Sequence, residues 1–319
     1  MRLNPRHLIL LDHSERNLNE IDLKLAATTV RSLFTSVLGD ICDTTLLREV
    51  LQHYHPHTVY HAAAFKHVPL METNPFAAVA NNALGTYNLV KLVRALRVPN
   101  MLTISTDKAV NPISIMGVSK RVAELALLHF YSPRTCMSAI RMGNVWGSQG
   151  SVVPTFVSQI SQGGPIIVTH PEASRYFLKI DEAVELMLLA SGLEDASGIF
   201  IPQIGAPLKI VDVARQLISQ GHSGGVKAID ITFTGLRAGD KMSEEFLFED
   251  EVLEPTVDGR LFRVADNRML NDRFHLDMDD LSNNVRQRDL TAMIETLCRI
   301  VPTYRPTKLL RHAAARASA

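Results

Sequence analysis

The stretch NMLTISTDKAVNPISIMGVSK, residues 100–120, decides the fold, because it joins a buried strand to a helix through a polar loop. Residues 100–106 form an almost continuous apolar run, typical of a strand buried on both faces of a parallel sheet. The apolar periodicity of residues 115–130 predicts a helix directly after the loop. A strand followed by a helix is the repeating unit of an α/β fold.

Similar units repeat through the first half of the chain. Further strands are predicted at residues 7–12, 32–40, 58–64 and 136–144, and helices at 17–30, 44–53 and 76–96. This alternation predicts a Rossmann-like, doubly wound parallel sheet. Ligands of such sheets bind outside the carboxyl ends of the strands. We therefore expect a shared site where the strands end in polar or small residues: Asp12, Asp40, Ala62, Ala63, Ala64, Ser105, Thr106, Asp107 and Asn144.

The regular alternation of predicted strands and helices ends after Gly150. Residues 154–171 are rich in proline and glycine, and then helices are predicted at 180–193 and 210–220, with strands at 199–202 and 229–233. This pattern predicts a smaller substrate-binding region. We divide the chain into a Rossmann-like domain at 1–148, a substrate-binding region at 149–270 and a tail at 271–319. The basic, alanine-rich end of the tail is expected to be a loose helix or disordered.

The composition is that of a soluble globular protein, with 46% hydrophobic and 21% charged residues. Lysine plus arginine equals aspartate plus glutamate, 33 against 33, so we expect no nucleic acid or anionic membrane as a partner. Three isolated cysteines argue against disulfides or a zinc site and for a reducing, cytoplasmic compartment. No apolar run reaches the roughly 18 residues of a membrane span.

A glycine-rich turn after the first strand normally binds the pyrophosphate of a dinucleotide. Here the first glycine is Gly39, and GNVWGSQG at residues 143–150 has the wrong spacing and lies late in the chain. That loop borders a substrate phosphate or simply connects a strand to a helix. We expect the sheet to lack its first βα unit, which leaves an unpaired, aggregation-prone edge. Isothermal titration of residues 1–319 should then show only weak dinucleotide binding.

Thr106, Asp107 and Lys108 place a hydroxyl, an acid and a base within three residues at a strand end. Asp107 and Lys108 can divide general acid and general base work if the site shifts their pKa values toward neutrality. The alternative is an ordinary surface ion pair.

Met116 and Lys120 lie four residues apart, on one face of the predicted helix. Lys120 is placed to bind a nicotinamide ribose, and the alternative is a solvated lysine. Asp12 can bind ribose hydroxyls and repel a 2′-phosphate, which favours NAD, or it can cap a helix. Arg16 would tolerate that phosphate, so NADP stays open. Asp40 is placed to reach the adenine end.

STDKAVNPISIMGVSKRVAE resembles the extended short-chain dehydrogenase/reductases of bacterial polysaccharide biosynthesis, above all the CapD-like UDP-N-acetylglucosamine 4,6-dehydratases. Further similar motifs are LILLDHSERNLNEI, HAAAFKHVPLMETNP, NALGTYNL, RMGNVWGSQGSVVPTF, GGPIIVTHPEASRYF and GLRAGDKMSEEF. Ordered motifs over about 240 residues are a specific signal. Many related enzymes have a tyrosine where this chain has Met116, but the membrane-anchored branch resembles this chain in having methionine.

The resemblance implies a reaction on UDP-N-acetylglucosamine with NAD. Carbon 4 gives a hydride to NAD+ and its hydroxyl proton to a group that stays open, with a water linked to Thr106 or Asp107 as the candidate. Lys108 then takes the carbon 5 proton, Asp107 protonates the hydroxyl that leaves carbon 6, and the hydride returns there. Thr106 would hold the carbon 4 oxygen. The expected catalytic residues are Thr106, Asp107, Lys108, Met116 and Lys120.

The resemblance also implies the binding residues and partners. The cofactor set is Asp12, Asp40, Ile41, Ala62, Ala63, Ala64, Asn82, Ser105 and Lys120. The substrate set is Lys66, His67, Asn144, Arg175 and Arg237. The expected partners are a UDP-sugar and further copies of the chain, with no metal, and longer relatives would be anchored to the inner membrane.

Several positions depart from the family pattern. Ala238 and Asp240 stand where proline and glutamate are usual, and Met142 stands where phenylalanine is usual. Together with the absent glycine turn, these changes support an N-terminally truncated, inactive fragment or pseudoenzyme as one alternative. A 4-epimerase is the other alternative, but it would need a group such as tyrosine at Met116 for reversible proton transfer at carbon 4.

Overall fold

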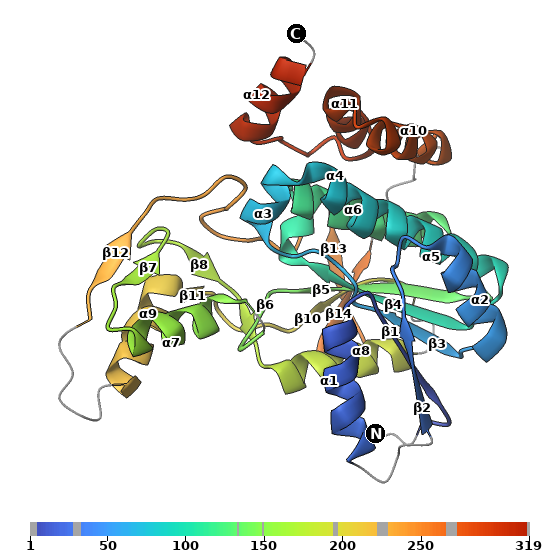
Figure 1. The fold of residues 1–319 in the computed structure, drawn as a ribbon, viewed down its shortest axis with the longest axis horizontal. Helices are drawn as coiled ribbons and strands as arrows, with labels where there is room; N and C mark the ends of the chain where they lie inside the picture. Colours follow the sequence, from blue (N-terminus) through green and yellow to red (C-terminus); the bar gives the residue numbers. More distant parts are fainter. Residues whose placement is uncertain are drawn as a thin grey trace.

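The computed structural model describes residues 5–27, 33–132, 134–148, 150–193, 197–221, 229–265 and 273–317. Within these residues the largest sheet has six strands in the order β13-β14-β10-β5-β4-β3 (Figure 1). The four parallel strands are β3 (Thr58–His61), β4 (Asn100–Thr106), β5 (Cys136–Met142) and β10 (Gly198–Pro202). The strands β14 (Leu261–Ala265) and β13 (Val252–Pro255) continue the sheet in antiparallel fashion.

Helices cover both faces of this sheet (Figure 1). One layer holds α2 (Thr44–Tyr54), α5 (Thr86–Ala95) and α6 (Ile115–His129), and the other holds α1 (Glu15–Ala26) and α8 (Ile180–Gly192). This arrangement confirms the predicted doubly wound α/β fold. The helix α6 begins where expected, because the Ser114 hydroxyl accepts a hydrogen bond from the Gly117 amide and caps the first turn.

The strands β1 (Leu8–Asp12) and β2 (Phe34–Leu38) form a separate parallel pair. Among the described residues, neither is hydrogen-bonded to β3, which is an edge strand of the main sheet. All five residues of β1 are partly exposed, whereas the apolar residues of β5 are almost all buried. In the common doubly wound order one further strand separates these two positions, so the described elements lack the first βα unit, as predicted. Residues 28–30 of the first predicted helix, and Ser32, lie outside the described residues.

The predicted helix at residues 76–96 is three consecutive segments: α4 (Pro75–Ala78), the π-helical turn η2 (Val79–Gly85), and α5. A short helix that was not predicted, α3 (Val68–Thr73), precedes them. The wider π turn carries Asn82, whose side chain is fully buried. Such turns are frequent at functional sites.

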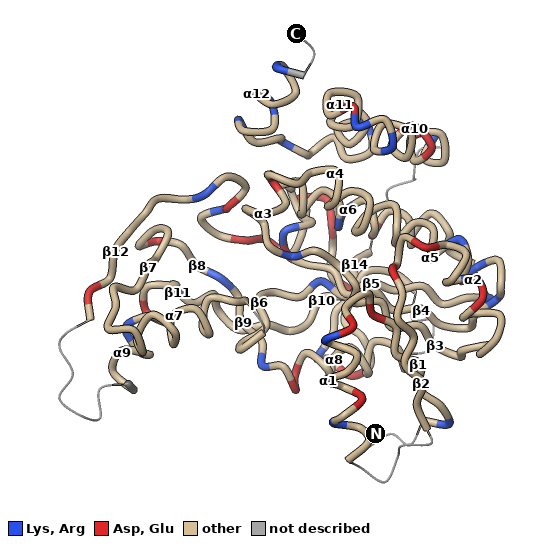
Figure 2. Tube along the Cα trace, viewed as in Figure 1, with Lys and Arg blue, Asp and Glu red and all other residues tan. Residues whose placement is uncertain are grey.

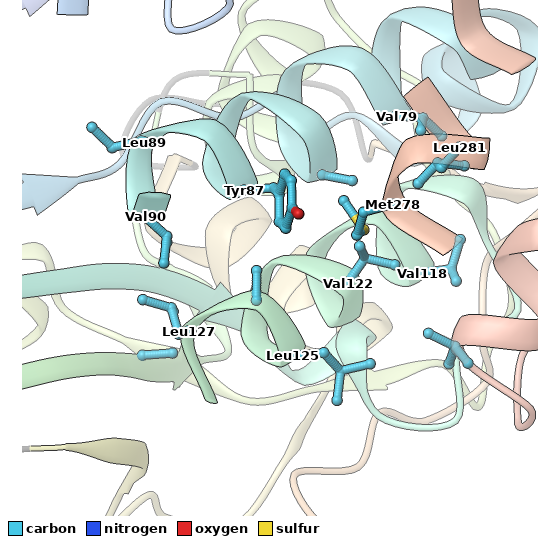
Figure 3. Close-up of a cluster of buried hydrophobic side chains, with 14 of the residues drawn as sticks. Val79, Tyr87, Leu89, Val90, Val118, Val122, Leu125, Leu127, Met278 and Leu281 are labelled. Carbon is cyan, nitrogen blue, oxygen red and sulfur yellow. The ribbon is translucent and has the colours of Figure 1, made fainter. Parts of the chain in front are cut away.

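The main apolar core lies between η2, α5, α6 and the sheet, and α10 closes it from outside (Figure 3). Met278 and Leu281 of α10 (Phe274–Gln287) pack beside Val79 and Val118, and all four are buried. The chain then continues through α11 (Leu290–Ile300) and α12 (Lys308–Ala317). Residues 308–317 of the tail are therefore helical, and Leu310 is buried in the same core.

A smaller lobe lies to one side of the sheet (Figure 1). It contains α7 (Val152–Ser161), β7 (Ile166–Val168), β8 (Ser174–Arg175), β11 (Leu208–Lys209), α9 (Ile210–Gly221) and β12 (Ile231–Phe233). The helix α7 was not predicted and overlaps the proline- and glycine-rich residues 154–171, and Pro154 lies in its first turn, where proline is tolerated.

The chain crosses between lobe and sheet more than once. The pair β6 (Asn144–Val145) and β9 (Phe177–Leu178) joins the two parts. Three strands that follow residue 149 are part of the main sheet: β10, β13 and β14. The predicted division at 148/149 therefore marks only the first point at which the chain passes from the main sheet to the smaller lobe. No helix among the described residues is both long and apolar enough to cross a membrane.

Candidate active site at the carboxyl end of β4

Thr106, Asp107 and Lys108 meet where β4 turns into the short 3₁₀ segment η3 (Asp107–Ala109). The Thr106 hydroxyl donates to Asp107 Oδ1 at 2.8 Å, and Lys108 Nζ donates to the same oxygen at 2.9 Å. Asp107 is fully buried, and its Oδ2 has no hydrogen-bond partner among the described residues. The surface-pair alternative is therefore wrong, and a buried carboxylate oxygen without a partner is unusual enough to mark this position as a candidate functional one.

Lys108 lies among charged groups from three parts of the chain. Its Nζ is 3.5 Å from Glu244 Oε1 and 3.5 Å from Asn144 Oδ1. Burial works to lower the pKa of Lys108, but the carboxylates of Asp107 and Glu244 outweigh it and raise the pKa. The resting lysine is thus an ammonium, and it can become a base by passing a proton to Asp107. Figure 2 shows acidic and basic positions gathered between the sheet and β8.

Met116 and Lys120 lie on α6, and both are at most 5% exposed. Lys120 is therefore not a solvated lysine, and its amine forms no hydrogen bond with any of the described residues. Burial lowers the pKa of Lys120 to about 8, with Glu124 opposing the change. The nearby His61 bonds Thr86 at 2.8 Å, and burial, with a contribution from Lys120, lowers its pKa to about 3. A buried amine of this kind suits the hydroxyls of a cofactor ribose.

We expect Lys120→Met to make the chain more stable at neutral pH by on the order of 2 kcal/mol, because it removes a buried ammonium. The folded pKa of about 8 lies below the ordinary 10.5, so the penalty is full below pH 8 and disappears as the pH rises toward 10.5. Urea unfolding at pH 7 and pH 10 measures this difference.

The matched control is Lys24→Met, at an exposed lysine paired with Glu20 on α1. We expect it to change the free energy of unfolding by less than about 0.5 kcal/mol. Equal effects of the two substitutions would contradict a buried charge at Lys120.

The residues predicted at the adenosine end make local bonds. Asp12 Oδ1 accepts from the Ser14 amide and Asp40 Oδ1 from the Cys42 amide, both at 2.8 Å. Ile41 is 5% exposed and belongs to the main core. Ser105 is buried and donates to Glu124 at 2.6 Å. Asp12 and Asp40 therefore stand at the ends of the β1–β2 pair, while Ser105 holds the base of the site.

Asn82 shapes the loop that carries Ala62, Ala63 and Ala64. Its amide accepts from the Phe65 amide at 2.8 Å and donates to the Phe65 carbonyl at 2.9 Å, and it also donates to Ser119. Its side chain is thus fully used in positioning the loop, and it would act on a cofactor only through that loop.

Lys66 and His67 lie at the end of this loop, next to the smaller lobe. Burial lowers the pKa of Lys66. The His67 ring lies against Gly150, where a Cβ atom would come within 2.7 Å of Cε1. The loop that carries the predicted substrate residues is therefore in direct contact with the connection to the lobe.

The predicted substrate arginines differ in their surroundings. Arg175 is 9% exposed, and its N–H groups donate to the carbonyls of Ser174, Lys241 and Met242. Arg237 is exposed and pairs with Asp240 at 2.8 Å. Asn144 and Arg175 thus join the Lys108 cluster, whereas Arg237 lies on the surface.

Two groups of residues that lie in or beside the candidate site were not predicted from the sequence. Glu244 lies within GLRAGDKMSEEF, and its place in that motif was the available signal. The second group is a buried network in which Arg141 donates to Glu124 at 3.0 Å and to Glu251 at 2.6 Å. Glu124 also accepts from Arg121 at 2.8 Å. Because Ser105 joins this network directly before Thr106, the network supports the backbone of the site.

A family profile described as "Polysaccharide biosynthesis protein" matches residues 1–266, which is most of the chain. The chain belongs to this polysaccharide biosynthesis family. It is 40% identical to the capsular polysaccharide biosynthesis protein CapD of Staphylococcus aureus over 294 residues, 91% of this chain and 49% of CapD. It is 43% identical to the probable polysaccharide biosynthesis protein EpsC of Bacillus subtilis over 252 residues, 78% of this chain and 42% of EpsC. The chain thus spans about half the length of these relatives.

Solved structures with the same fold include Pen from Bacillus thuringiensis, with a TM-score of 0.75, 26% identity, and coverage of 85% of this chain and 82% of Pen. DesIV, a dTDP-glucose 4,6-dehydratase from Streptomyces venezuelae solved with NAD and TYD, gives a TM-score of 0.65 at 20% identity, covering 76% and 79%. These structures confirm the Rossmann-like architecture for the polysaccharide biosynthesis chain.

Proposed function

We propose that the chain carries the active site of a nucleotide-sugar 4,6-dehydratase that acts on a UDP-N-acetylglucosamine-type substrate with NAD. The observation that carries the proposal is the buried Asp107–Lys108 pair with Thr106 bonded to it. Elimination of water needs one acid and one base held side by side, and this pair supplies both.

The resting ion pair and the reactive state of Asp107 and Lys108 hold the same number of protons and differ only in which of the two groups carries one of them. Transfer from Lys108 Nζ to Asp107 across 2.9 Å gives a neutral amine and a carboxylic acid. Lys108 then takes the carbon 5 proton, and Asp107 gives its proton to the oxygen that leaves carbon 6 as water. The resting ammonium and carboxylate are restored, so the pair completes the elimination without an outside proton. Thr106 would hold the carbon 4 oxygen.

NAD, when bound, supplies the hydride acceptor for carbon 4. Lys120, with its buried amine, would hold the ribose next to the nicotinamide, and Asp12 would meet the adenosine ribose. The turns after β1 and β2 show no glycine-rich loop that would cradle a pyrophosphate. The residues present therefore suit the two riboses of the cofactor rather than its phosphates.

A 4-epimerase is the second candidate, since the chain is 31% identical to the UDP-glucose 4-epimerase of Rickettsia rickettsii over 255 residues, 78% of this chain and 72% of that protein. Both reactions begin by removing the carbon 4 hydroxyl proton, so the absence of a titratable group at Met116 counts against both. Elimination is favoured by the buried Asp107–Lys108 pair, because 4-epimerisation has no use for an acid and a base at carbons 5 and 6.

The test is incubation with UDP-N-acetylglucosamine and NAD+, followed by mass spectrometry of the sugar nucleotide. We expect a product lighter by one water, with the carbonyl at carbon 4. A product of unchanged mass and inverted configuration would replace the proposal with an epimerase. Measurable binding of both compounds without turnover would replace it with the inactive-protein alternative.

A further inference from the structure

We propose that Glu244 is a positioning residue of this site, which stabilises the positive charge that Lys108 gains when it takes the carbon 5 proton. The proposal rests on the proposed dehydration. It assigns a role to a residue that lies 136 positions from Lys108 in the sequence but beside it in the structure, with Nζ and Oε1 3.5 Å apart.

Glu244 lies on a segment that is fastened to the smaller lobe on one side. Arg175 donates to the carbonyls of Lys241 at 2.8 Å and Met242 at 3.1 Å. The Ser174 amide donates to the Met242 carbonyl at 3.0 Å. The Lys241 amine donates to the Val110 carbonyl at 2.8 Å and ties the segment to the loop after η3.

The other side of the segment is fastened to the main sheet. Arg141 donates to the Phe246 carbonyl at 2.7 Å and to Glu251 at 2.6 Å. Glu251 in turn accepts from the Phe248 amide at 3.0 Å. Glu244 lies between these two sets of hydrogen bonds. They hold the backbone on both sides of it and so restrict where its carboxylate can lie.

The surroundings of Glu244 indicate an electrostatic role. The residue is 5% exposed, and its Oε2 has no hydrogen-bond partner among the described residues. Its other oxygen is 3.5 Å from Lys108 Nζ and 3.6 Å from Arg175 Nε. A buried carboxylate that lacks hydrogen bonds is unfavourable for stability. Its place beside Lys108 is therefore better explained by its charge than by packing.

The charged groups that face Lys108 are Asp107, Glu244 and Arg175, with the neutral Asn144 beside them. When the Lys108 proton resides on Asp107, Glu244 is the remaining carboxylate next to the amine. It is thus already in place as the amine becomes an ammonium again, and its fixed charge makes proton abstraction by the neutral amine more favourable.

The first test measures the ionisation of Lys108 in the 319-residue chain. Lysines are dimethylated with ¹³C-formaldehyde and titrated by NMR, and the Lys108 signal is assigned by its loss in Lys108→Arg. We expect Glu244→Gln to lower the pKa of Lys108 by about one unit. Glu244→Asp should give an intermediate shift, and it keeps the test open if the glutamine variant does not fold. An unchanged Lys108 pKa in a folded variant would overturn the proposal.

The matched control is Glu245→Gln. Glu245 is the next residue, but its side chain is 55% exposed and meets Lys241 at 3.8 Å and Asn111 at 3.1 Å. We expect Glu245→Gln to leave the pKa of Lys108 unchanged in the NMR titration. In dehydration assays, Glu244→Gln should shift the pH profile of kcat to lower pH, because it lowers the pKa of Lys108, with little change in KM. Wild type that forms no dehydrated product would overturn the proposed function, whereas the NMR titration still decides the role of Glu244.

Discussion

Lys108→Met is expected to lower the rate of the proposed dehydration by about 10³-fold, because it removes the proposed base for the carbon 5 proton. Methionine keeps most of the side-chain volume at a position that is only partly exposed, with a 20% exposed side chain. Binding of the UDP-sugar should change little, since Lys108 faces Asp107 and Glu244 in the resting site.

Two readouts measure this effect. The rate of product formation gives the overall loss, and deuterium uptake at carbon 5 from D₂O reports proton abstraction alone. The control is Lys209→Met, at a half-exposed lysine paired with Glu172 in the smaller lobe. A Lys108→Met protein that keeps more than a tenth of the rate, or that still exchanges the carbon 5 proton at the wild-type rate, would show that another group is the base.

Glu124→Gln is expected to lower the free energy of unfolding by about 3–5 kcal/mol, the usual effect of removing one partner from a buried ion pair. Glu124 is 1% exposed, and it accepts from Arg141, Arg121 and Ser105. The substitution removes the negative charge that accepts hydrogen bonds from two buried guanidinium groups, those of Arg141 and Arg121. Urea unfolding followed by circular dichroism measures the change.

The same network predicts a pH dependence. Burial alone would raise the pKa of Glu124, but Arg141 and Arg121 lower it to about 2, from an ordinary value of 4.5. Its contribution to stability is therefore present above pH 4.5 and is lost as the pH falls toward 2. The difference in the free energy of unfolding between wild type and Glu124→Gln should become smaller as the pH falls from 4.5 toward 2.

The control for this substitution is Glu254→Gln. Glu254 lies on the edge strand β13, where its half-exposed side chain pairs with Arg263 at 3.0 Å. We expect Glu254→Gln to change the free energy of unfolding by less than about 0.5 kcal/mol. A similarly small effect at Glu124 would mean that the buried network adds little to stability.

Local patterns predicted the elements of the sheet well. The bounds of β4 agree with the apolar run at 100–106, and α6 begins at the predicted residue 115. The predicted strand at 136–144, by contrast, divides at Gly143 into β5 and β6. A Cβ atom at Gly143 would lie 2.8 Å from the Tyr176 carbonyl oxygen, and such a close approach of a distant segment leaves no mark in local periodicity.

The candidate site was predictable where its residues are neighbours in sequence or lie in a recognisable motif, as Asn144 and Arg175 do. The Thr106–Asp107–Lys108 triplet and the Met116–Lys120 spacing could be recognised from local order. The contact of Lys108 with Glu244, and that of Arg141 with Glu251, join segments more than a hundred residues apart. Charged side chains also look like surface residues in a sequence, because most of them are, so their burial becomes visible only in the fold.

The separation of the β1–β2 pair from the main sheet has a consequence for how the molecule opens. Among the described residues, the backbone hydrogen bonds of this pair join β1 to β2, whereas β4 is bonded on both sides, to β3 and β5. Cooperative opening units follow such boundaries. The amides of β1 and β2 can therefore exchange with solvent through a local opening that leaves β4 and the Thr106–Lys108 turn intact.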